Sequence, residues 1–428
     1  SYLVLMSDLP EKRPISLYFH IPFCAHRCAY CDFNTYAGQE GMIPAYVDAL
    51  CNEVELIGER LLTHEPYNPV TVGTIFFGGG TPSLLSPSQF DSILTAIRAR
   101  FTLTADAEIT MEANPGACSF HDLLALRSLG INRVSFGAQS ANAEELRMLE
   151  RVHDFFDVIE AVTSARKAGF DNLNLDLIYG LPEQTLQTWQ TSVKRVLDLH
   201  PEHISAYALT LEHGTPFGRW AAKGLLPLPD PDLAAEMYEW TSEVFESKGY
   251  VQYEISNWAK ANAEFGILHS EFMCRHNLQY WRSLPYLAFG AGAHGYTHGY
   301  RYSNVLRIKT YIDRLASQPV DTPQASNLPF PLSPAAVNHH KQTMQDDMSE
   351  FMMTGLRLTR EGVSAGEFQS RFHTPLREAY GKEIEALLKL GLVEWREPGS
   401  AGENDASARM RLTSRARLLA NQVFIRFV

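Results

Sequence analysis

Three cysteines near the start of the chain have a residue type and a spacing that suit metal chemistry. Cys24, Cys28 and Cys31 form the pattern C-x3-C-x2-C in one short segment. Three thiolates this close together can bind three irons of a four-iron cluster, whereas electron-transfer clusters of that size use four cysteines. The pattern therefore predicts an iron–sulfur cluster with one open iron, at which a small molecule can bind.

Zinc is the main alternative for this loop. The C-x2-C spacing is common in zinc sites, and His20 or His26 would supply a fourth ligand. A second Cys/His pair normally closes such a site, and none follows at the usual spacing. A disulfide is the weaker alternative, because three cysteines are an odd number and no secretory signal pattern is seen.

The composition is that of an ordinary globular protein in a reducing compartment, for which we expect the cytoplasm. The 428 residues include 45% hydrophobic and 20% charged residues and only six cysteines. No apolar run approaches the roughly 20 residues that cross a bilayer. A formal net charge of −12 argues against a nucleic-acid partner, because such surfaces are usually basic.

Short apolar runs alternate with amphipathic stretches up to about residue 250. This alternation is typical of parallel βαβ units, and six repeats predict an α/β fold with a partial, open (β/α)6 barrel. The predicted strands cover residues 17–23, 74–78, 108–114, 133–139, 172–179 and 204–210. The predicted helices cover residues 42–61, 86–100, 119–129, 141–168, 184–198 and 231–248.

Polar and apolar residues alternate within these strands. Asn172, Asn174 and Asp176 share one face of their strand, and leucines occupy the other. The apolar face must contact the helices, so the polar face points into the barrel. Barrel interiors are normally filled with branched apolar side chains, and a polar interior therefore predicts a wet or ligand-filled cavity.

The pattern changes after residue 250, and we expect three domains. These are the barrel (1–250), a barrel extension and connecting segment (251–335), and a C-terminal domain (336–428). In the second domain, residues 252–258 suggest a further strand and residues 289–295 a tight glycine-rich loop. The last domain reads as helices, a hairpin and a helix, which is typical of a winged-helix-like α+β module. Because the chain is acidic, we expect this module to pack on protein or meet a partner.

Several residues with binding chemistry fall at the predicted carboxyl ends of strands, where barrels place their sites. Gly79 and Gly80, followed by Thr81, let the backbone approach a ligand closely. The carboxylates of Glu112 and Asp176 could bind ribose hydroxyls or an ammonium group. The amide of Gln139 could bind a carboxylate or ribose, and the guanidinium of Arg151 a carboxylate. Ala208 also lies at a predicted strand end.

Together these motifs resemble the radical S-adenosylmethionine (SAM) superfamily. The resemblance is closest to the oxygen-independent coproporphyrinogen III oxidase family and its relative, the HemW-type heme chaperones, and it runs from about Leu17 to the C-terminus. It rests on the three-cysteine loop and on the segments Gly79-Gly80-Thr81-Pro82, Met111-Glu112-Ala113-Asn114-Pro115, Ser135-Phe136-Gly137-Ala138-Gln139-Ser140 and Asn174-Leu175-Asp176-Leu177-Ile178-Tyr179-Gly180-Leu181-Pro182.

The resemblance implies a [4Fe-4S] cluster and SAM as cofactors. Cys24, Cys28 and Cys31 would bind the cluster. The residues implied to contact SAM are Tyr18, Tyr30, Gly79, Gly80, Thr81, Glu112, Gln139, Arg151, Asp176 and Ala208. In the oxidase some of these positions serve a second SAM molecule, so one or two bound molecules remain open.

Two functions from different classes are compatible with the resemblance. The first is an oxidative decarboxylase of coproporphyrinogen, and the second is a chaperone that binds heme and delivers it to an acceptor protein. The oxidase family has a further cysteine two residues after the third, where this chain has Phe33. The chain as given also begins a short way before the cysteine loop, without the oxidase's longer N-terminal extension. Both features favour the chaperone.

A segment that resembles the His-Asn-x-x-Tyr-Trp motif of the chaperones is the predicted heme site. Histidine and cysteine are axial heme ligands and aromatic rings stack on the macrocycle; the residues concerned are Cys274, His276, Tyr280 and Trp281. The alternative is that His276 caps a turn and the aromatics are core. His294 is a second ligand candidate, and residues 262–273 look like an insertion. The sequence does not identify the acceptor protein, which includes the question whether it is membrane-associated. It also leaves open whether the protein forms a homodimer.

Overall fold

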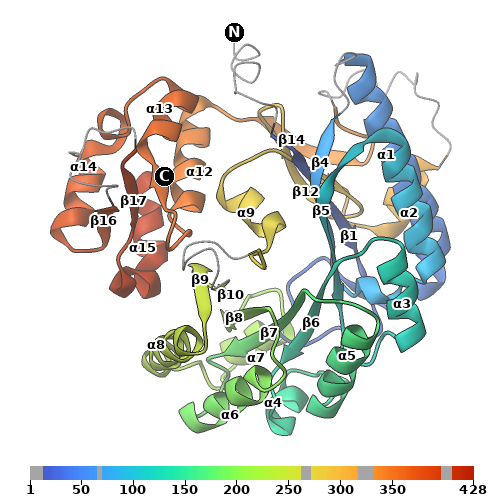
Figure 1. The fold of residues 1–428 in the computed structure, drawn as a ribbon, viewed down its shortest axis with the longest axis horizontal. Coiled ribbons are helices and arrows are strands. Elements are labelled where there is room, and N and C mark those ends of the chain that lie inside the picture. The colour runs from blue at the N-terminus through green and yellow to red at the C-terminus, as the bar shows by residue number, and fades with distance from the viewer. Residues whose placement is uncertain (1–12, 65–69, 262–270, 317–330, 397–406) are drawn as a thin grey trace. The chain divides into compact units, whose positions relative to one another are not determined.

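The computed structural model describes residues 13–64, 70–261, 271–316, 331–396 and 407–428. These residues divide into two compact units (Figure 1). The barrel unit comprises Arg13–Glu243 and Tyr286–His340, and the C-terminal unit comprises Val244–Pro285 and Lys341–Val428. That the chain has separate domains with boundaries at residues 250 and 335 remains a prediction.

Six parallel strands, adjacent in space in chain order, form the centre of the barrel unit, as predicted. Helices connect them and lie on the outer face of the sheet (Figure 1). The strands are β1 (Ile15–Ile21), β4 (Thr71–Gly79), β5 (Thr102–Ala113), β6 (Arg133–Gln139), β7 (Leu173–Tyr179) and β8 (His203–Ala208). The helices are α1 (Ile43–His64), α2 (Pro87–Arg100), α3 (Phe120–Ser128), α4 (Ala143–Met148), α5 (Phe155–Lys167), α6 (Leu186–Leu197), α7 (Pro216–Ala222) and α8 (Pro231–Ser247).

The single helix predicted over residues 141–168 is wrong, because the structure has two helices there. The side chain of Asp154 accepts hydrogen bonds from the backbone of Phe156 and Asp157 and so starts α5 anew. Glu150 has a φ of 56°, in the left-handed region, which ends the preceding helical stretch. The break between the helices contains Arg151, one of the predicted site residues.

Further strands widen the sheet on the other side of β1. β11 (Tyr286–Phe289) runs parallel to β1, and β12 (His294–Thr297) and β13 (Tyr300–Asn304) follow as antiparallel neighbours. The predicted glycine-rich loop is the turn between β11 and β12. The outermost strand is β14 (Ala336–Lys341), and helix α10 (Ile308–Leu315) follows β13.

The barrel interior is polar and internally hydrogen-bonded, which agrees with the predicted alternation. Asn174 is at the centre: its amide nitrogen donates to Ser135 Oγ (2.7 Å) and Asp176 Oδ1 (2.8 Å). Its amide oxygen lies 2.6 Å from His203 Nδ1 and accepts from Ser205 Oγ at 3.2 Å. These side chains hold one another in place, as buried polar groups must be hydrogen-bonded to be stable.

A buried carboxylate connects the sheet extension to the first helix. Glu53, on α1, is fully buried and accepts four hydrogen bonds. The donors are Gly290 N (2.9 Å), Asn304 Nδ2 (3.0 Å), Tyr311 OH (2.6 Å) and Ser333 Oγ (2.5 Å). They come from four segments that lie far from Glu53 in the sequence, so this residue fixes the turn after β11 against the barrel.

The C-terminal unit contains the winged-helix-like arrangement predicted for residues 336–428. Its three-stranded antiparallel sheet has the order β15–β17–β16, and helices precede and follow it. The elements are α12 (Met344–Gly355), β15 (Val363–Ser364), α13 (Ala365–Phe372), α14 (Leu376–Lys389), β16 (Val393–Arg396), β17 (Arg409–Leu412) and α15 (Ala420–Phe424). Their apolar side chains form a core of their own.

A second part of this unit precedes β11 in the chain. The single strand predicted at residues 252–258 is a hairpin, β9 (Tyr250–Glu254) and β10 (Asn257–Lys260), and α9 (Arg275–Trp281) follows. Thr359 Oγ1 donates to Gln252 O at 2.9 Å, and Arg357 pairs with the buried Glu254 at 3.2 Å. Most of the apparent insertion (262–270) lies outside the described residues. None of the helices described is long and apolar enough to cross a membrane.

Candidate cluster and cofactor site

The three cysteines lie in the loop that follows β1, at the carboxyl edge of the barrel. Cys24 ends the short strand β2 (Phe23–Cys24) and is buried, while Cys28 and Cys31 are partly exposed. The backbone turns tightly between the last two, with Cys31 N donating to Cys28 O at 3.2 Å. The thiols are close enough for Cys28 and Cys24 to affect the ionisation of Cys31.

Burial raises the pKa of the Cys24 and Cys31 thiols, and the neighbouring cysteines raise it further. Three thiolates at this position therefore need a cationic ligand to compensate them, and cluster iron meets that need. Two hydrogen-bond donors already point at the sulfurs: Thr81 Oγ1 lies 3.6 Å from Cys24 Sγ, and Arg151 Nη1 lies 3.6 Å from Cys28 Sγ. Donors of this kind stabilise thiolate ligands and tune cluster potentials. The residues fit an iron–sulfur cluster.

The geometry gives the zinc alternative no support. Both ring nitrogens of His20 are engaged, with Nε2 2.9 Å from Asn34 O and Nδ1 2.9 Å from Tyr18 OH. His26 Nε2 lies 3.3 Å from the carboxylate of Glu150.

The glycine loop after β4 packs directly against the cysteine loop. Gly79 has a φ of 110°, and a Cβ there would lie 2.5 Å from the His20 ring. A Cβ on Gly80 would lie 2.6 Å from Phe23 O and 3.1 Å from Cys24 Sγ. Both glycines are therefore required for the two loops to pack together. This packing is a second reason for glycine at these positions, besides the predicted close approach of a ligand.

Two partly buried carboxylates face the same interior. Glu112 Oε2 accepts from Gly79 N at 3.1 Å, and Asp176 Oδ2 accepts from Ser135 Oγ at 3.0 Å. Burial raises the pKa of Glu112 to about 7, and the charge of Asp176 raises it as well. Burial also raises the pKa of Asp176, against hydrogen bonds that lower it. A cationic ligand would stabilise both ionised forms.

Arg151 connects the cysteine loop to the end of β6. Its Nη2 donates to Asn114 Oδ1 (2.7 Å) and Gly137 O (2.9 Å), and its Nε is buried without a hydrogen-bond partner in the structure. Gln139 has a φ of 63°, where the β6–β7 register shifts. His153 Nε2 lies 3.1 Å from Ala138 O and supports this bend. The unpartnered Nε is a donor available to a carboxylate ligand.

Asn114 and His153 contribute to the site without a role predicted from the sequence. Asn114 appears in a quoted motif, and its position directly after a predicted strand was the available signal. For His153, whose partner is a backbone carbonyl, the sequence carries no comparable signal.

The other predicted SAM residues lie in the same unit. Tyr30 is beside Arg151 and Cys28, and burial raises its pKa. Tyr18 lies on β1 next to His20, and burial raises its pKa too. Ala208 ends β8, where it is paired with Tyr179 and exposed. All ten residues therefore belong to the strands of the barrel unit and the loops that follow them. Their contact with SAM stays a prediction.

The predicted heme segment belongs to the C-terminal unit. Cys274 is fully buried at the start of α9, and His276 is 1% exposed. His276 Nε2 lies 2.7 Å from Tyr280 OH, and the guanidinium of Arg357 lies 4.3 Å from the centre of the Trp281 ring. In this conformation neither predicted ligand is presented to solvent, and the heme assignment stays a prediction.

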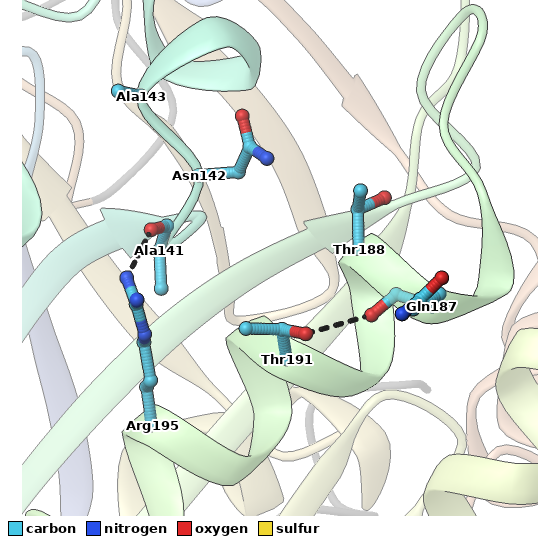
Figure 2. A pocket seen from close by; sticks show the side chains of 7 residues that line it. All are labelled: Ala141, Asn142, Ala143, Gln187, Thr188, Thr191 and Arg195. Atoms are coloured by element: carbon cyan, nitrogen blue, oxygen red, sulfur yellow. Dashed lines mark hydrogen bonds between the residues drawn. The ribbon is translucent and has the colours of Figure 1, made fainter.

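A shallow polar pocket lies on the outside of the barrel unit, near α4 and α6 (Figure 2). Its volume is about 310 Å³, and Arg195 at its edge already donates to Ala141 O at 3.0 Å. The lining residues are Ala141, Asn142, Ala143, Gln187, Thr188, Thr191 and Arg195. None of the predicted site residues is among them.

Comparison with known proteins agrees with this geometry. The family model of the Radical SAM superfamily matches residues 18–196, and that of the HemN C-terminal domain matches residues 342–398. The solved structure of coproporphyrinogen III oxidase HemN from Escherichia coli, described as a radical SAM enzyme, has a TM-score of 0.76 at 24% identity. The match covers 100% of this chain and 92% of the HemN chain. Fold and cysteine loop together define a radical SAM protein.

Relatives in sequence narrow the class. The heme chaperone HemW of Bacillus subtilis is 38% identical over 414 residues, which are 96% of this chain and 99% of the relative. The heme chaperone HemW of Escherichia coli is 40% identical over 284 residues, 66% of this chain and 70% of the relative. The chain belongs to the heme chaperone HemW family. The [4Fe-4S] cluster and SAM are the cofactors of its radical SAM class, and the site described above fits them.

Proposed function

We propose that this protein is a heme chaperone, which binds heme and delivers it to acceptor proteins. The observation that carries the proposal is the relationship along nearly the whole chain to proteins named heme chaperone HemW. Because both the barrel unit and the C-terminal unit fall within the matched length, the proposal concerns the entire arrangement and not one module.

The second position after the third cysteine supports this function over the oxidase. Phe33 stands where the oxidase family has a further cysteine, and its side chain is 63% exposed. A phenylalanine contributes no thiolate at this position. Coproporphyrinogen oxidation is therefore the second candidate function.

The cluster and SAM would be held in the barrel unit. Cys24, Cys28 and Cys31 would hold the cluster, with Thr81 and Arg151 donating to their sulfurs. Glu112 and Asp176 would face the cationic part of SAM, and Arg151 Nε would meet its carboxylate. When bound, the cluster and SAM supply one-electron chemistry; whether the protein uses it to cleave SAM is left to experiment.

In the C-terminal unit, we propose the segment with Cys274, His276, Tyr280 and Trp281 as the heme site. Ligation through His276 Nε2 requires this nitrogen to leave Tyr280 OH, because the two atoms are hydrogen-bonded in the described conformation. Replacing Cys274 and His276 with alanine and titrating heme by absorbance tests the placement. Unchanged affinity and spectrum would contradict it.

The partners follow from the cargo. We propose that the acceptors are heme-binding proteins, some of them associated with a membrane. We also propose that cluster loading favours a homodimer. We place the protein in the cytoplasm, with support from its six free cysteines. Size-exclusion chromatography with and without cluster tests the homodimer.

One anaerobic experiment separates the two functions. The cluster is reconstituted, SAM and reductant are added, and either heme or coproporphyrinogen III is supplied. We expect stable heme binding, followed by transfer to an apo-acceptor, and no decarboxylation by mass spectrometry. Conversion to protoporphyrinogen with release of deoxyadenosine would make the protein an oxidase.

A further inference from the structure

Asn34, three residues after the last cluster cysteine, joins three segments of the barrel unit. Its Nδ2 donates to Ala291 O (3.1 Å), in the turn after β11, and to Leu306 O (3.0 Å), in the turn after β13. Its own carbonyl accepts from His20 Nε2 at 2.9 Å. Tyr36 OH also donates to Leu306 O, at 3.1 Å. The cysteine loop and these two turns therefore form one continuous rim at the carboxyl end of β1.

Two large apolar side chains of this rim are exposed. Phe33, the neighbour of Asn34 in the chain, is 63% exposed, and Leu306, whose carbonyl binds Asn34, is 58% exposed. Neither belongs to the described hydrophobic core. Exposed apolar area where several segments converge marks a binding surface more often than an isolated exposed leucine does.

A histidine lies on the same rim. His294 begins β12 and is exposed. It is two residues from Gly292, where a Cβ would lie 2.4 Å from Asn34 Nδ2. Burial lowers the pKa of His20, and His294 is near enough to add to that lowering. Histidine is a common axial ligand of heme iron, and an exposed imidazole is accessible to it.

Two exposed arginines complete the rim. Arg27, in the cysteine loop, has its Nη2 3.5 Å from Phe33 O. Arg307 directly follows Leu306 and is exposed as well. Guanidinium groups bind carboxylates in bidentate fashion, so the rim combines apolar contact, an imidazole and cations for anionic groups.

We propose that this rim, formed by Phe33, His294, Leu306, Arg27 and Arg307, is a heme-binding surface beside the cluster. His294 ligates the iron, Phe33 and Leu306 contact the porphyrin plane, and the two arginines pair with the propionates. The bond formed is one coordination bond from imidazole nitrogen to iron, and it displaces a weak solvent ligand. The proposal rests on the proposed heme-carrying function and adds to the α9 segment a second surface that holds the cargo in transit.

The openness of the rim suits a cargo that must leave again. A permanent heme is enclosed by its protein, whereas a heme in transit has to offer one face to the acceptor. A rim with apolar residues on the surface binds part of the macrocycle and leaves the remainder accessible. Its position at the cysteine loop also puts cargo where cluster loading can influence binding.

Heme titration of the full, cluster-loaded protein tests the ligand. His294→Ala should weaken heme binding by at least about tenfold, a change of ~1.4 kcal/mol, and should abolish the absorbance signature of imidazole ligation. His121→Ala, an exposed histidine on α3, is the matched control and should change neither. Iron and sulfide content reports whether each variant retains its fold and cluster.

The apolar and charged contacts are tested separately. The double variant Phe33→Ser, Leu306→Ser should weaken heme binding, while Phe156→Ser, whose side chain is also 63% exposed, should not. The double variant Arg27→Gln, Arg307→Gln should weaken heme binding and reduce its dependence on salt, since paired surface charges are screened by salt.

The outcomes distinguish a failure of the rim as a heme-binding surface from a failure of the proposed heme-chaperone function. If His294→Ala binds heme like the wild type while His276→Ala does not, the rim is not the heme site, although the chaperone function stands. If the wild-type protein itself binds no heme under any cluster state, the proposed function fails, and the rim with it. Loss of binding in His294→Ala with His276→Ala unaffected supports the rim alone.

Discussion

Glu112 is the residue in which burial and ligand chemistry oppose each other. Its carboxylate lies in the barrel interior, near Asp176, and its pKa is raised to about 7 from an ordinary value of 4.5. Between these two pH values the folded protein retains a proton that the unfolded chain has lost. The contribution of Glu112 to stability therefore falls as the pH rises through this window and stays at its minimum above pH 7.

We predict that Glu112→Gln stabilises the ligand-free protein at pH 8, by up to roughly 3 kcal/mol for a shift of this size. The amide carries no charge to desolvate and can still accept from Gly79 N. Thermal unfolding at pH 5 and pH 8 measures the effect, which should be much smaller at pH 5. The same variant should bind SAM more weakly by calorimetry. A variant less stable at pH 8 would contradict the argument.

Cys28 gives the corresponding prediction for the cluster. Cys28→Ser should abolish the iron–sulfur absorbance and the bound iron and sulfide, because two cysteines do not hold the cluster in place. Cys118→Ser, at a partly exposed free cysteine elsewhere in the barrel unit, is the control and should retain full loading. Full iron and sulfide in Cys28→Ser would refute the cluster assignment.

At this scale the sequence predicts ligands better than it predicts their surroundings. The cysteine spacing is local, so three nearby thiols could be expected without a fold. The roles of Asn114, His153 and Asn34 depend on atoms that approach from distant segments, chiefly backbone carbonyls, which leave no mark in the sequence. The burial of His276 under Tyr280 likewise depends on packing.

Among the elements, α1 and the sheet extension are tied together by Glu53. Burial raises the pKa of this carboxylate, and the four donors around it lower the pKa in opposition. Breaking one side of a buried, hydrogen-bonded charge network leaves donors without acceptors, which costs several kcal/mol. The network therefore maintains the turn that begins at Gly290, next to the cysteine loop.

We predict that Glu53→Gln lowers the stability of the protein by about 2–4 kcal/mol, because the amide nitrogen would face donors. Glu55→Gln, at an exposed position two residues away on the same helix, should be nearly neutral. Thermal unfolding of both variants with matched cluster content measures the difference. Equal transition temperatures for the two variants would contradict this role of Glu53.

The sequence predicts the order and type of the elements well and their interruptions poorly. The strand at residues 133–139 has the predicted bounds, since Val134, Phe136 and Ala138 alternate with small or polar residues there. The break between α4 and α5 was missed because apolar periodicity continues across it, whereas the cap at Asp154 decides the local structure. The hairpin at β9 and β10 was missed because both its strands are short.

For the molecule as a whole, the chain passes between its two units more than once. Residues 244–285 belong with residues 341–428, although β11 to β14 intervene. The sequence pattern changes near residues 250 and 335, which predicts two boundaries, but it does not mark the return of the chain to the barrel unit at Tyr286. Contacts such as the pair of Arg357 and Glu254 unite the two parts of the C-terminal unit.

We predict that a fragment of residues 336–428 folds alone but with reduced stability. Its buried apolar core is drawn from residues 351–427, which the fragment retains. It loses the acceptors at Gln252 and Glu254 for Thr359 and Arg357. Circular dichroism should show a cooperative thermal transition at a lower temperature than that of the same unit in the full chain. A fragment with no cooperative transition would contradict an independent domain.

The placement of β1 between β4 and β11 has a consequence during synthesis on the ribosome. One edge of β1 is covered soon after it emerges, while the other waits for Tyr286–Phe289. At roughly 5–20 residues per second this wait is on the order of ten to fifty seconds. Throughout that time the nascent barrel presents an unpaired strand edge, and the cysteine loop above it lacks the turn that Asn34 binds. The surroundings of the cysteine loop are therefore complete only after the turn that follows β11 has been synthesised.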